Sequence, residues 1–273
     1  MIQLVCSSPQ TLKKFTDENL ASASFCWDYL IKNKEIKVNG KKTGADVMLG
    51  VGDTVAYYMT KKQEERFGFT VTYEDENVCI VDKESGVNAE AVFAELSRRL
   101  DGKCAFIHRL DRNTMGLMAF AKTAVAEQAL LQAFKERTVD KRYLALCVGD
   151  FPKREDVLTA YLKKDEQRAQ VYVSLQKTKD SERIVTEYRV IEKRVDGTSL
   201  AEIILHTGKT HQIRAHLAFI GCPVLGDTKY GNNEWNKAKK CTRQQLIAKY
   251  LTFTFSGALA YLSGKTFISA YTL

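Results

Sequence analysis

The 273-residue sequence lacks several features that would place it in a membrane or secreted class. It has no apolar run approaching the about 18 residues that span a bilayer. Its first residues, MIQLVCSSPQ, do not form the basic and then apolar pattern of a signal peptide. The seven cysteines lie singly, which is typical of neither a zinc framework nor a secreted disulfide scaffold. We therefore expect a soluble protein of the reducing cytoplasm.

The sequence also lacks the local motifs of several kinds of site. It contains no Gly-Lys-Ser/Thr phosphate loop, no Gly-x-Gly-x-x-Gly stretch and no nucleophile elbow around a serine or cysteine. Of its four histidines, His211 and His216 are five residues apart, whereas two ligands on one helical face need a spacing of three or four. No metal site is predicted.

Positive charge, by contrast, is in surplus. The 41 lysines and arginines exceed the 33 acidic residues, which leaves a net charge of +8 and a pI near 9.0. The surplus favours a polyanionic partner such as nucleic acid, although a mildly basic enzyme fits equally well. A hydrophobic content of 45% and a charged content of 27% are ordinary for a globular protein. The length allows one large domain or two unequal ones.

The first 62 residues read as a small α+β domain. The stretch SFCWDYLIKNKEI has helical apolar spacing, with Ser24 as a candidate N-cap. Asn39-Gly40 lies between two short extended runs and predicts a tight hairpin turn. The alternating stretch GDTVAYYM then predicts a strand, and the charged stretch TKKQEERFG predicts a linker to a second domain over residues 63–273.

In the second predicted domain, strands outnumber helices and do not alternate strictly with them. This pattern favours an α+β fold on a mixed, mainly antiparallel sheet. Helices are predicted over 89–100 and over 123–137 with Thr123 as N-cap. A third is predicted to follow Thr210 as its N-cap, and Arg214 lies off its apolar stripe. Strands are predicted over 67–73, 77–83, 141–149, 184–194, 199–207, 250–255 and 265–271.

One short stretch, HRLDRNTMGL, concentrates charge in a predicted loop. Asp111 lies between Arg109 and Arg112. Neighbouring arginines lower the pKa of a carboxyl and keep it ionised, which suits a nucleophile or a base. The same pattern is common in solvated ion pairs at protein surfaces, so the residues alone leave both interpretations open.

Four stretches together resemble one family. HRLDRNTMGLMAFAK is similar to the HRLDRxTSGL motif of the RluA-type pseudouridine synthases. YEDENVCIVDKESGV, KRYLALCVG and LHTGKTHQIRAHLAFIGCPVLGDTKYG resemble its other motifs, and all four follow the family order between Tyr73 and Gly231. The resemblance implies the pseudouridine synthase fold. Met115, Glu84 and Lys209 depart from the family pattern and bear on substrate choice and turnover.

The resemblance also implies a role for particular residues. Asp111 would attack the target uridine, Arg214 would pair with Asp111, Tyr143 would stack beneath the flipped uracil, and Arg109 would fill the gap that the base leaves in the RNA. The wider set implied to bind substrate is His108, Arg109, Arg112, Lys83, Lys141, His211 and Gln212.

The N-terminal pattern of helix, VNGKK hairpin and GDTV strand resembles the S-four-type RNA-binding module. The family's usual Arg-Leu-Asp start is replaced by LKKFTDENL. The resemblance implies phosphate contacts from a set of lysines, for which a solvated charged face is the alternative. These lysines are Lys32, Lys34, Lys37, Lys41 and Lys42.

The resemblance as a whole implies a monomeric enzyme that isomerises a uridine in structured RNA. Ribosomal RNA is the expected substrate and transfer RNA the alternative. The reaction involves no net redox change and no group transfer, so no cofactor is expected. Two rival hypotheses are an inactive RNA-binding protein of the same fold and a glycosidase. A glycosidase needs a second catalytic carboxylate about 5 Å or more from the first, and the motifs contain none.

Overall fold

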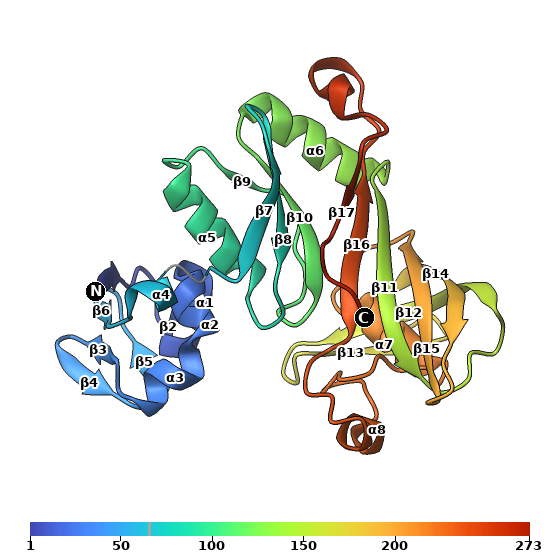
Figure 1. Ribbon diagram of the computed structural model, residues 1–273, viewed down its shortest axis with the longest axis horizontal. Coiled ribbons are helices and arrows are strands. Elements are labelled where there is room, and N and C mark those ends of the chain that lie inside the picture. The colour runs from blue at the N-terminus through green and yellow to red at the C-terminus, as the bar shows by residue number, and fades with distance from the viewer. Residues whose placement is uncertain (65–66) are drawn as a thin grey trace. The chain divides into compact units, whose positions relative to one another are not determined.

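The computed structural model describes residues 1–64 and 67–273 (Figure 1). The chain divides into two compact units. The first unit comprises residues 1–112 and 118–127, and the second comprises residues 113–117 and 128–273. The division of the chain at residue 62 into an RNA-binding and a catalytic domain stays a prediction, and that boundary falls inside the first unit.

The N-terminal part of the first unit is built on a small antiparallel sheet with the strand order β1-β6-β3-β4. These strands are β1 (Ile2–Val5), β3 (Ile36–Val38), β4 (Lys41–Thr43) and β6 (Thr54–Tyr57). A second, two-stranded pair joins β2 (Gln10–Thr11) to β5 (Met48–Leu49). Three short helices accompany the strands: α1 (Leu12–Asn19), α2 (Ala21–Phe25) and α3 (Trp27–Lys32).

A compact apolar core holds this part together. Leu12, Leu30, Ile36, Val55 and Tyr57 are all fully buried in it. The predicted hairpin turn is confirmed, because Asn39 and Gly40 have positive φ angles of 49° and 79° between β3 and β4.

The prediction that Ser24 caps a helix is wrong. Ser24 lies inside α2, and α3 begins at Trp27 with Cys26 as its N-cap. The Ser24 hydroxyl instead donates a hydrogen bond of 2.6 Å to Asp17. Within the predicted linker, Lys61–Glu64 form a short helix, α4. Residues 65 and 66 of that linker lie outside the described residues.

The rest of the first unit pairs two strands and packs a helix against the N-terminal helices. β7 (Phe69–Glu74) and β8 (Val78–Lys83) are antiparallel, as are β9 (Ala105–Phe106) and the end of β10 (Met115–Ala121). Helix α5 (Ala89–Arg99) packs against both α1 and α2. The first turn of α6 (Ala124–Glu136) also belongs here, and its predicted cap is confirmed by a hydrogen bond of 3.2 Å from the Ala126 amide to the Thr123 hydroxyl.

The second unit is built on a larger sheet with the order β13-β12-β14-β15-β11-β16, in which all neighbours are antiparallel (Figure 1). Residues 115 and 116 of β10 add a parallel pairing with β16, and β17 (Thr266–Ile268) adds an antiparallel one. The sheet is therefore mixed and mainly antiparallel, and the predicted α+β class is confirmed. Its main strands are β11 (Asp140–Val148), β12 (Glu155–Asp165), β13 (Gln170–Ser174), β14 (Ser181–Lys193), β15 (Thr198–Leu205) and β16 (Leu246–Thr252).

Three further helical segments complete the second unit: α7 (Gln212–Phe219), α8 (Asn233–Ala238) and the 3-10 helix η1 (Gly257–Leu262). The prediction that Thr210 caps α7 is wrong. His211 is the N-cap residue, and its φ of 55° places it in the left-handed region that non-glycine residues seldom adopt. No helix among residues 1–64 and 67–273 is both long and apolar enough to cross a membrane.

Candidate active site

The loop that carries Asp111 is fixed from beneath by a buried lysine. Lys83, at the end of β8, has no exposed surface. Its ammonium donates hydrogen bonds to three backbone carbonyls, those of Glu84 at 2.9 Å, Val87 at 2.8 Å and Arg112 at 3.0 Å. An ammonium has three N–H donors, so all three are satisfied. Lys83 thus ties the residue after Asp111 to the turn between β8 and α5.

The charge state of Lys83 reflects two opposing influences. Burial lowers the pKa of its ammonium to about 7, and the negative charge of Asp111 raises it. The opposing influence of Asp111 indicates that its carboxylate lies within electrostatic reach of the ammonium. The resemblance implies that Lys83 binds substrate, which stays a prediction; in the structure its ammonium anchors the backbone of the loop.

The two residues that begin the motif have different environments. The His108 Nε2 atom accepts a hydrogen bond of 3.0 Å from the Ala119 amide, so this nitrogen carries no proton and His108 is held against β10. Arg109 has a side chain that is 68% exposed, and it forms an ion pair of 2.9 Å with Glu90. A solvent-facing guanidinium fits the implied role of Arg109 as a group that enters the RNA stack.

The loop continues into the second unit, where a glycine allows close approach to a strand. Gly116 has a φ of +113° and pairs with Ala248 of β16. A Cβ atom at Gly116 would lie 2.3 Å from the Ala248 carbonyl oxygen, which no side chain tolerates. The glycine of HRLDRNTMGL is therefore required by the parallel pairing of β10 with β16.

Tyr143 lies on β11, between β15 and β16. It pairs with Ile203 on one side and Ala248 on the other, and it is nearly buried. The register between β11 and β16 shifts between Arg142 and Tyr143. Such bulges redirect a side chain locally and are frequent beside active sites. Tyr143 is thus an aromatic ring on a rigid strand at a bulge.

Arg214 is held in a buried, bidentate ion pair. Its Nε and Nη2 atoms donate to the two carboxylate oxygens of Asp227 at 2.7 and 3.0 Å, and the side chains of Arg214 and Asp227 are 8% and 0% exposed. The guanidinium also lies 5.1 Å from the centre of the Tyr230 ring. Two-point contact fixes both the position and the plane of the Arg214 guanidinium.

Asp227 is the partner of a predicted site residue, and the sequence reasoning missed it, although it lies inside one of the four motif stretches, in LGDTKYG. Burial alone would raise the pKa of its carboxyl, but the hydrogen bonds and charge of Arg214 and two backbone amides lower it overall. Those amides belong to Lys229, at 2.9 Å, and Tyr230, at 3.1 Å. Asp227 therefore stays ionised beside Arg214.

Three other residues implied to bind substrate have contacts inside the second unit. Gln212 is buried, and its side-chain amide makes four hydrogen bonds, to Thr207, Lys209, Val185 and Thr186. These bonds hold the start of α7 against β14. The Nδ1 atom of His211 lies 2.9 Å from the Tyr230 hydroxyl, and the Lys141 ammonium lies 5.0 Å from the centre of the Phe134 ring.

The lysines that are predicted to contact RNA lie on or close to the N-terminal sheet. Lys37 and Lys42 lie directly opposite each other on β3 and β4, and Lys41 adjoins them. Lys32, Lys34, Lys41 and Lys42 are exposed, and Lys37 is half-buried over the Tyr58 ring. Like charges opposite each other destabilise a sheet, and a bound polyanion relieves this repulsion.

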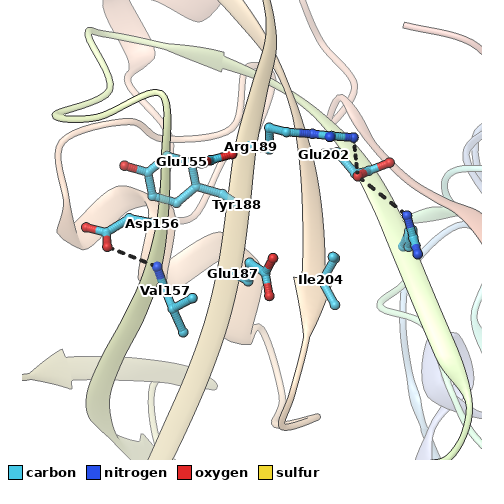
Figure 2. A pocket seen from close by; sticks show the side chains of 9 residues that line it. Glu155, Asp156, Val157, Glu187, Tyr188, Arg189, Glu202 and Ile204 are labelled. Carbon is cyan, nitrogen blue, oxygen red and sulfur yellow. Dashed lines mark hydrogen bonds and ion pairs between the residues drawn. The ribbon is translucent and has the colours of Figure 1, made fainter.

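A cavity of about 560 Å³ opens elsewhere, over β11, β12, β14 and β15 of the second unit. In Figure 2, Glu202 points toward Arg189, and the two side chains form an ion pair of 3.1 Å. The lining residues include none of the residues predicted for the site. In the described part of the chain, no group of three or more His, Cys, Asp or Glu side chains is placed to hold a metal ion.

The predicted catalytic residues are divided between the two units. In the first unit, Asp111 lies in a loop that is anchored by Lys83 and flanked by an exposed arginine. In the second unit, Tyr143 and Arg214 are each held by neighbours on rigid elements. The pairing of Asp111 with Arg214 stays a prediction. A carboxylate, an aromatic ring and a fixed guanidinium are each a kind of group that chemistry on a nucleobase and its sugar employs.

Comparison with known proteins gives consistent results. Residues 31–219 match the family described as RNA pseudouridylate synthase. The chain is 29% identical over 256 residues to the "Uncharacterized RNA pseudouridine synthase YlyB" of Bacillus subtilis (strain 168), which covers 84% of this chain and 83% of that protein. It is 31% identical over 230 residues to the "Ribosomal large subunit pseudouridine synthase C" of Vibrio vulnificus (strain CMCP6), with coverage of 76% and 71%.

Two other similar proteins are one that is named for transfer RNA and one with a solved structure. The "tRNA pseudouridine(32) synthase, mitochondrial" of Saccharomyces cerevisiae is 29% identical over 217 residues, which is 75% of this chain and 46% of that protein. The structure of "Human RNA Pseudouridylate Synthase Domain Containing 1" superposes with a TM-score of 0.59 at 27% identity, and covers 67% of this chain and 77% of that one.

Proposed function

The chain belongs to the RNA pseudouridylate synthase family, and we propose that it converts one uridine of ribosomal RNA to pseudouridine with Asp111 as the catalytic residue. It is therefore an isomerase that acts on RNA. The reaction breaks the bond from N1 of uracil to C1′ of the ribose, turns the base, and joins its C5 to C1′. The base loses the proton on C5 and gains one on N1, so no oxidant or reductant is consumed.

Asp111 is assigned the first step. An ionised carboxylate either attacks C1′ directly or removes a proton from the sugar, and both routes need the same charge. The observation that carries this assignment is the three-carbonyl anchor of Lys83, which fixes the backbone beside Asp111 in the family's motif. A reacting group held in one position avoids the entropy of ordering it in the transition state.

Arg214 and Tyr143 are assigned supporting roles. The forked contact with Asp227 leaves the Arg214 guanidinium in one orientation, which suits it to keep a second carboxylate ionised and aimed. Tyr143, on its bulged strand, supplies a flat surface for the flipped base and a hydroxyl that can take part in moving the C5 proton. Arg109, exposed in the loop, would occupy the space that the base leaves.

We further propose that residues 1–62 are an RNA-binding module of the S-four type. The four-stranded sheet, the Asn39-Gly40 turn and the exposed lysines on β3 and β4 support this. Ribosomal RNA is the favoured substrate because the relative that is 31% identical is named for the large ribosomal subunit. Transfer RNA is the alternative, supported by the yeast relative.

Mapping of pseudouridines in cellular RNA tests the substrate. Ribosomal and transfer RNA would be purified separately from cells with the gene, without it, and with an Asp111→Asn copy. The proposal predicts that one position in ribosomal RNA loses its pseudouridine in the last two strains. Loss at a transfer RNA position instead would establish the alternative, and an unchanged map in both RNAs would refute the function.

A further inference from the structure

An ion pair joins the catalytic loop to the N-terminal module, residues 1–62. Nη1 of Arg112 lies 3.2 Å from Oδ2 of Asp17, which is 95 residues earlier in the chain. Asp17 belongs to α1, and Arg112 directly follows Asp111. Both residues belong to the first unit, in which α1 and α2 also pack against α5.

The Asp17 carboxylate is buried and divided between two sets of partners. Its side chain is 8% exposed. Oδ1 accepts hydrogen bonds from the Lys13 ammonium and, at 2.6 Å, from the Ser24 hydroxyl, both within the N-terminal module. Oδ2 accepts from Arg112. One oxygen is therefore satisfied inside the module, while the other faces the loop, and a buried carboxylate oxygen is unfavourable without a partner.

Hydrogen bonds hold both the backbone carbonyl and the side chain of Arg112. Its backbone carbonyl accepts from the Lys83 ammonium at 3.0 Å and from the Gly86 amide at 2.9 Å. Its Nε donates to the Gly86 carbonyl at 3.0 Å, and its Nη1 donates to Asp17. With both ends fixed, the backbone on either side of Arg112 has little freedom to rotate. Asp111 shares that backbone.

We propose that Asp17 is a positioning residue for the catalytic loop, so that the N-terminal module takes part in forming the active site as well as in binding RNA. Asp17 acts through Arg112, which carries the constraint to Asp111. That a displaced Asp111 slows the reaction rests on the proposed function. That Asp17 holds the loop in place does not depend on that function. The link joins the module that carries these lysines directly to the residue beside the reacting group.

The central variant is Asp17→Asn, which keeps the size of the side chain and removes its charge. Glu18→Gln is the matched control, because Glu18 is the next residue on α1 and pairs with Lys14 at an exposed position, 3.8 Å away. Ser24→Ala is a second control, because it removes a different hydrogen bond to the Asp17 carboxylate without touching Arg112. All variants are made in the full chain, and their thermal melts are recorded.

Two measurements follow. The first is hydrogen–deuterium exchange of the backbone amides over residues 108–113, without RNA. The second is the single-turnover rate of tritium release from C5-labelled RNA at saturating enzyme, together with the Kd for that RNA. Asp17→Asn should exchange faster in the loop and lower the rate by about tenfold, because small misplacement of a reacting group is costly. Its Kd should change less than about twofold, since RNA affinity depends mainly on phosphate contacts.

Glu18→Gln should match the wild type in both measurements, and Ser24→Ala should lower the melting temperature while keeping the rate. An Asp17→Asn/Arg112→Gln double variant should react no more slowly than Arg112→Gln alone, because Asp17 acts through Arg112. Unchanged loop exchange in folded Asp17→Asn would overturn the proposal. So would an equal loss of rate in Ser24→Ala, or additive losses in the double variant.

If Asp17→Asn does not fold, Arg112→Lys takes its place, because a lysine keeps the charge but lacks the fork that reaches both Gly86 and Asp17. Faster loop exchange in Arg112→Lys supports the anchor, and unchanged exchange overturns it. A wild-type protein that releases no tritium would refute the proposed function, and the exchange measurement would still decide whether Asp17 holds the loop.

Discussion

Two aspartate–arginine pairs include or adjoin a residue that is proposed for catalysis, and their geometries differ. In the second unit, Asp227 and Arg214 meet through two hydrogen bonds and are almost wholly buried. In the first unit, Asp17 and Arg112 meet through one contact of 3.2 Å, and the Arg112 side chain is 41% exposed. A buried bidentate pair has one geometry, whereas a half-exposed single contact tolerates several.

The difference corresponds to what each pair must do. Arg214 sits on α7 and is proposed to aim a carboxylate, which needs a fixed guanidinium. Arg112 sits in a loop and links that loop to a module that is proposed to bind a large, variable RNA surface. The Asp17–Arg112 contact needs only to hold the loop beside that module, for which one hydrogen bond suffices, whereas a guanidinium that aims a carboxylate needs two.

The largest expected effect comes from breaking the buried pair. Asp227→Asn leaves the Arg214 guanidinium buried without a negative partner, which should lower the free energy of unfolding by about 3–5 kcal/mol. Asp17→Asn should lower it by less, because its two cationic partners, Lys13 and Arg112, have side chains that are 19% and 41% exposed and can turn to solvent. Chemical denaturation of both variants measures the comparison. Equal losses would show that burial does not distinguish the two pairs.

The helix that carries Arg214 should also be sensitive to acid. Burial lowers the pKa of His216 on α7 to about 4, from an ordinary value near 6.5. Between these values the unfolded chain binds a proton that the folded chain does not, so stability falls as the pH decreases from 6.5 to 4. The loss is about 3 kcal/mol at pH 4.

Thermal melts at a series of pH values would measure this loss. His216→Gln is the control. In the wild type, Nδ1 of His216 lies 2.9 Å from the Thr186 hydroxyl. Glutamine keeps a group that can bond with this hydroxyl, and its side chain does not titrate in this range. The control should flatten the dependence between pH 6.5 and 4. An equally steep dependence in His216→Gln would assign the acid sensitivity to other groups.

A smaller effect on stability, with a large one on rate, is expected for Arg214→Lys. Lysine keeps the positive charge beside Asp227 but lacks the planar, forked pair of N–H donors that fixes the orientation of the guanidinium. The single-turnover rate should fall by about 100-fold, as expected for a misdirected group, with little change in Kd for RNA. A rate near that of the wild type would show that charge alone, without orientation, suffices at this position.

Local chemistry explains which features were predictable from the sequence. The Asn39-Gly40 turn and the Thr123 cap depend on neighbouring residues, so the sequence was enough. Serine often caps a helix by bonding to a nearby backbone amide, which is why the sequence predicts a cap at Ser24. In the structure the Ser24 hydroxyl donates to Asp17 on another helix instead. His211 replaces Thr210 as the cap through a left-handed conformation that propensity disfavours.

The partners of the proposed site residues are the part that sequence spacing does not reveal. Asp227 lay inside a quoted motif, but nothing in its spacing indicated that it pairs with Arg214, 13 residues away. The link between Asp17 and Arg112 spans 95 residues and depends on how α1 packs. The motifs therefore predict which residues form the site, and the fold is needed to show which residues contact them.

The most direct test of the account is tritium release by Asp111→Asn. Asparagine keeps the size and some of the hydrogen bonding of aspartate but removes the charge that either route requires. The variant should melt near the wild-type temperature, bind RNA with comparable affinity and release no tritium from C5 of the labelled uridine. Substantial release by a folded Asp111→Asn protein would contradict the assignment of Asp111 as the catalytic residue.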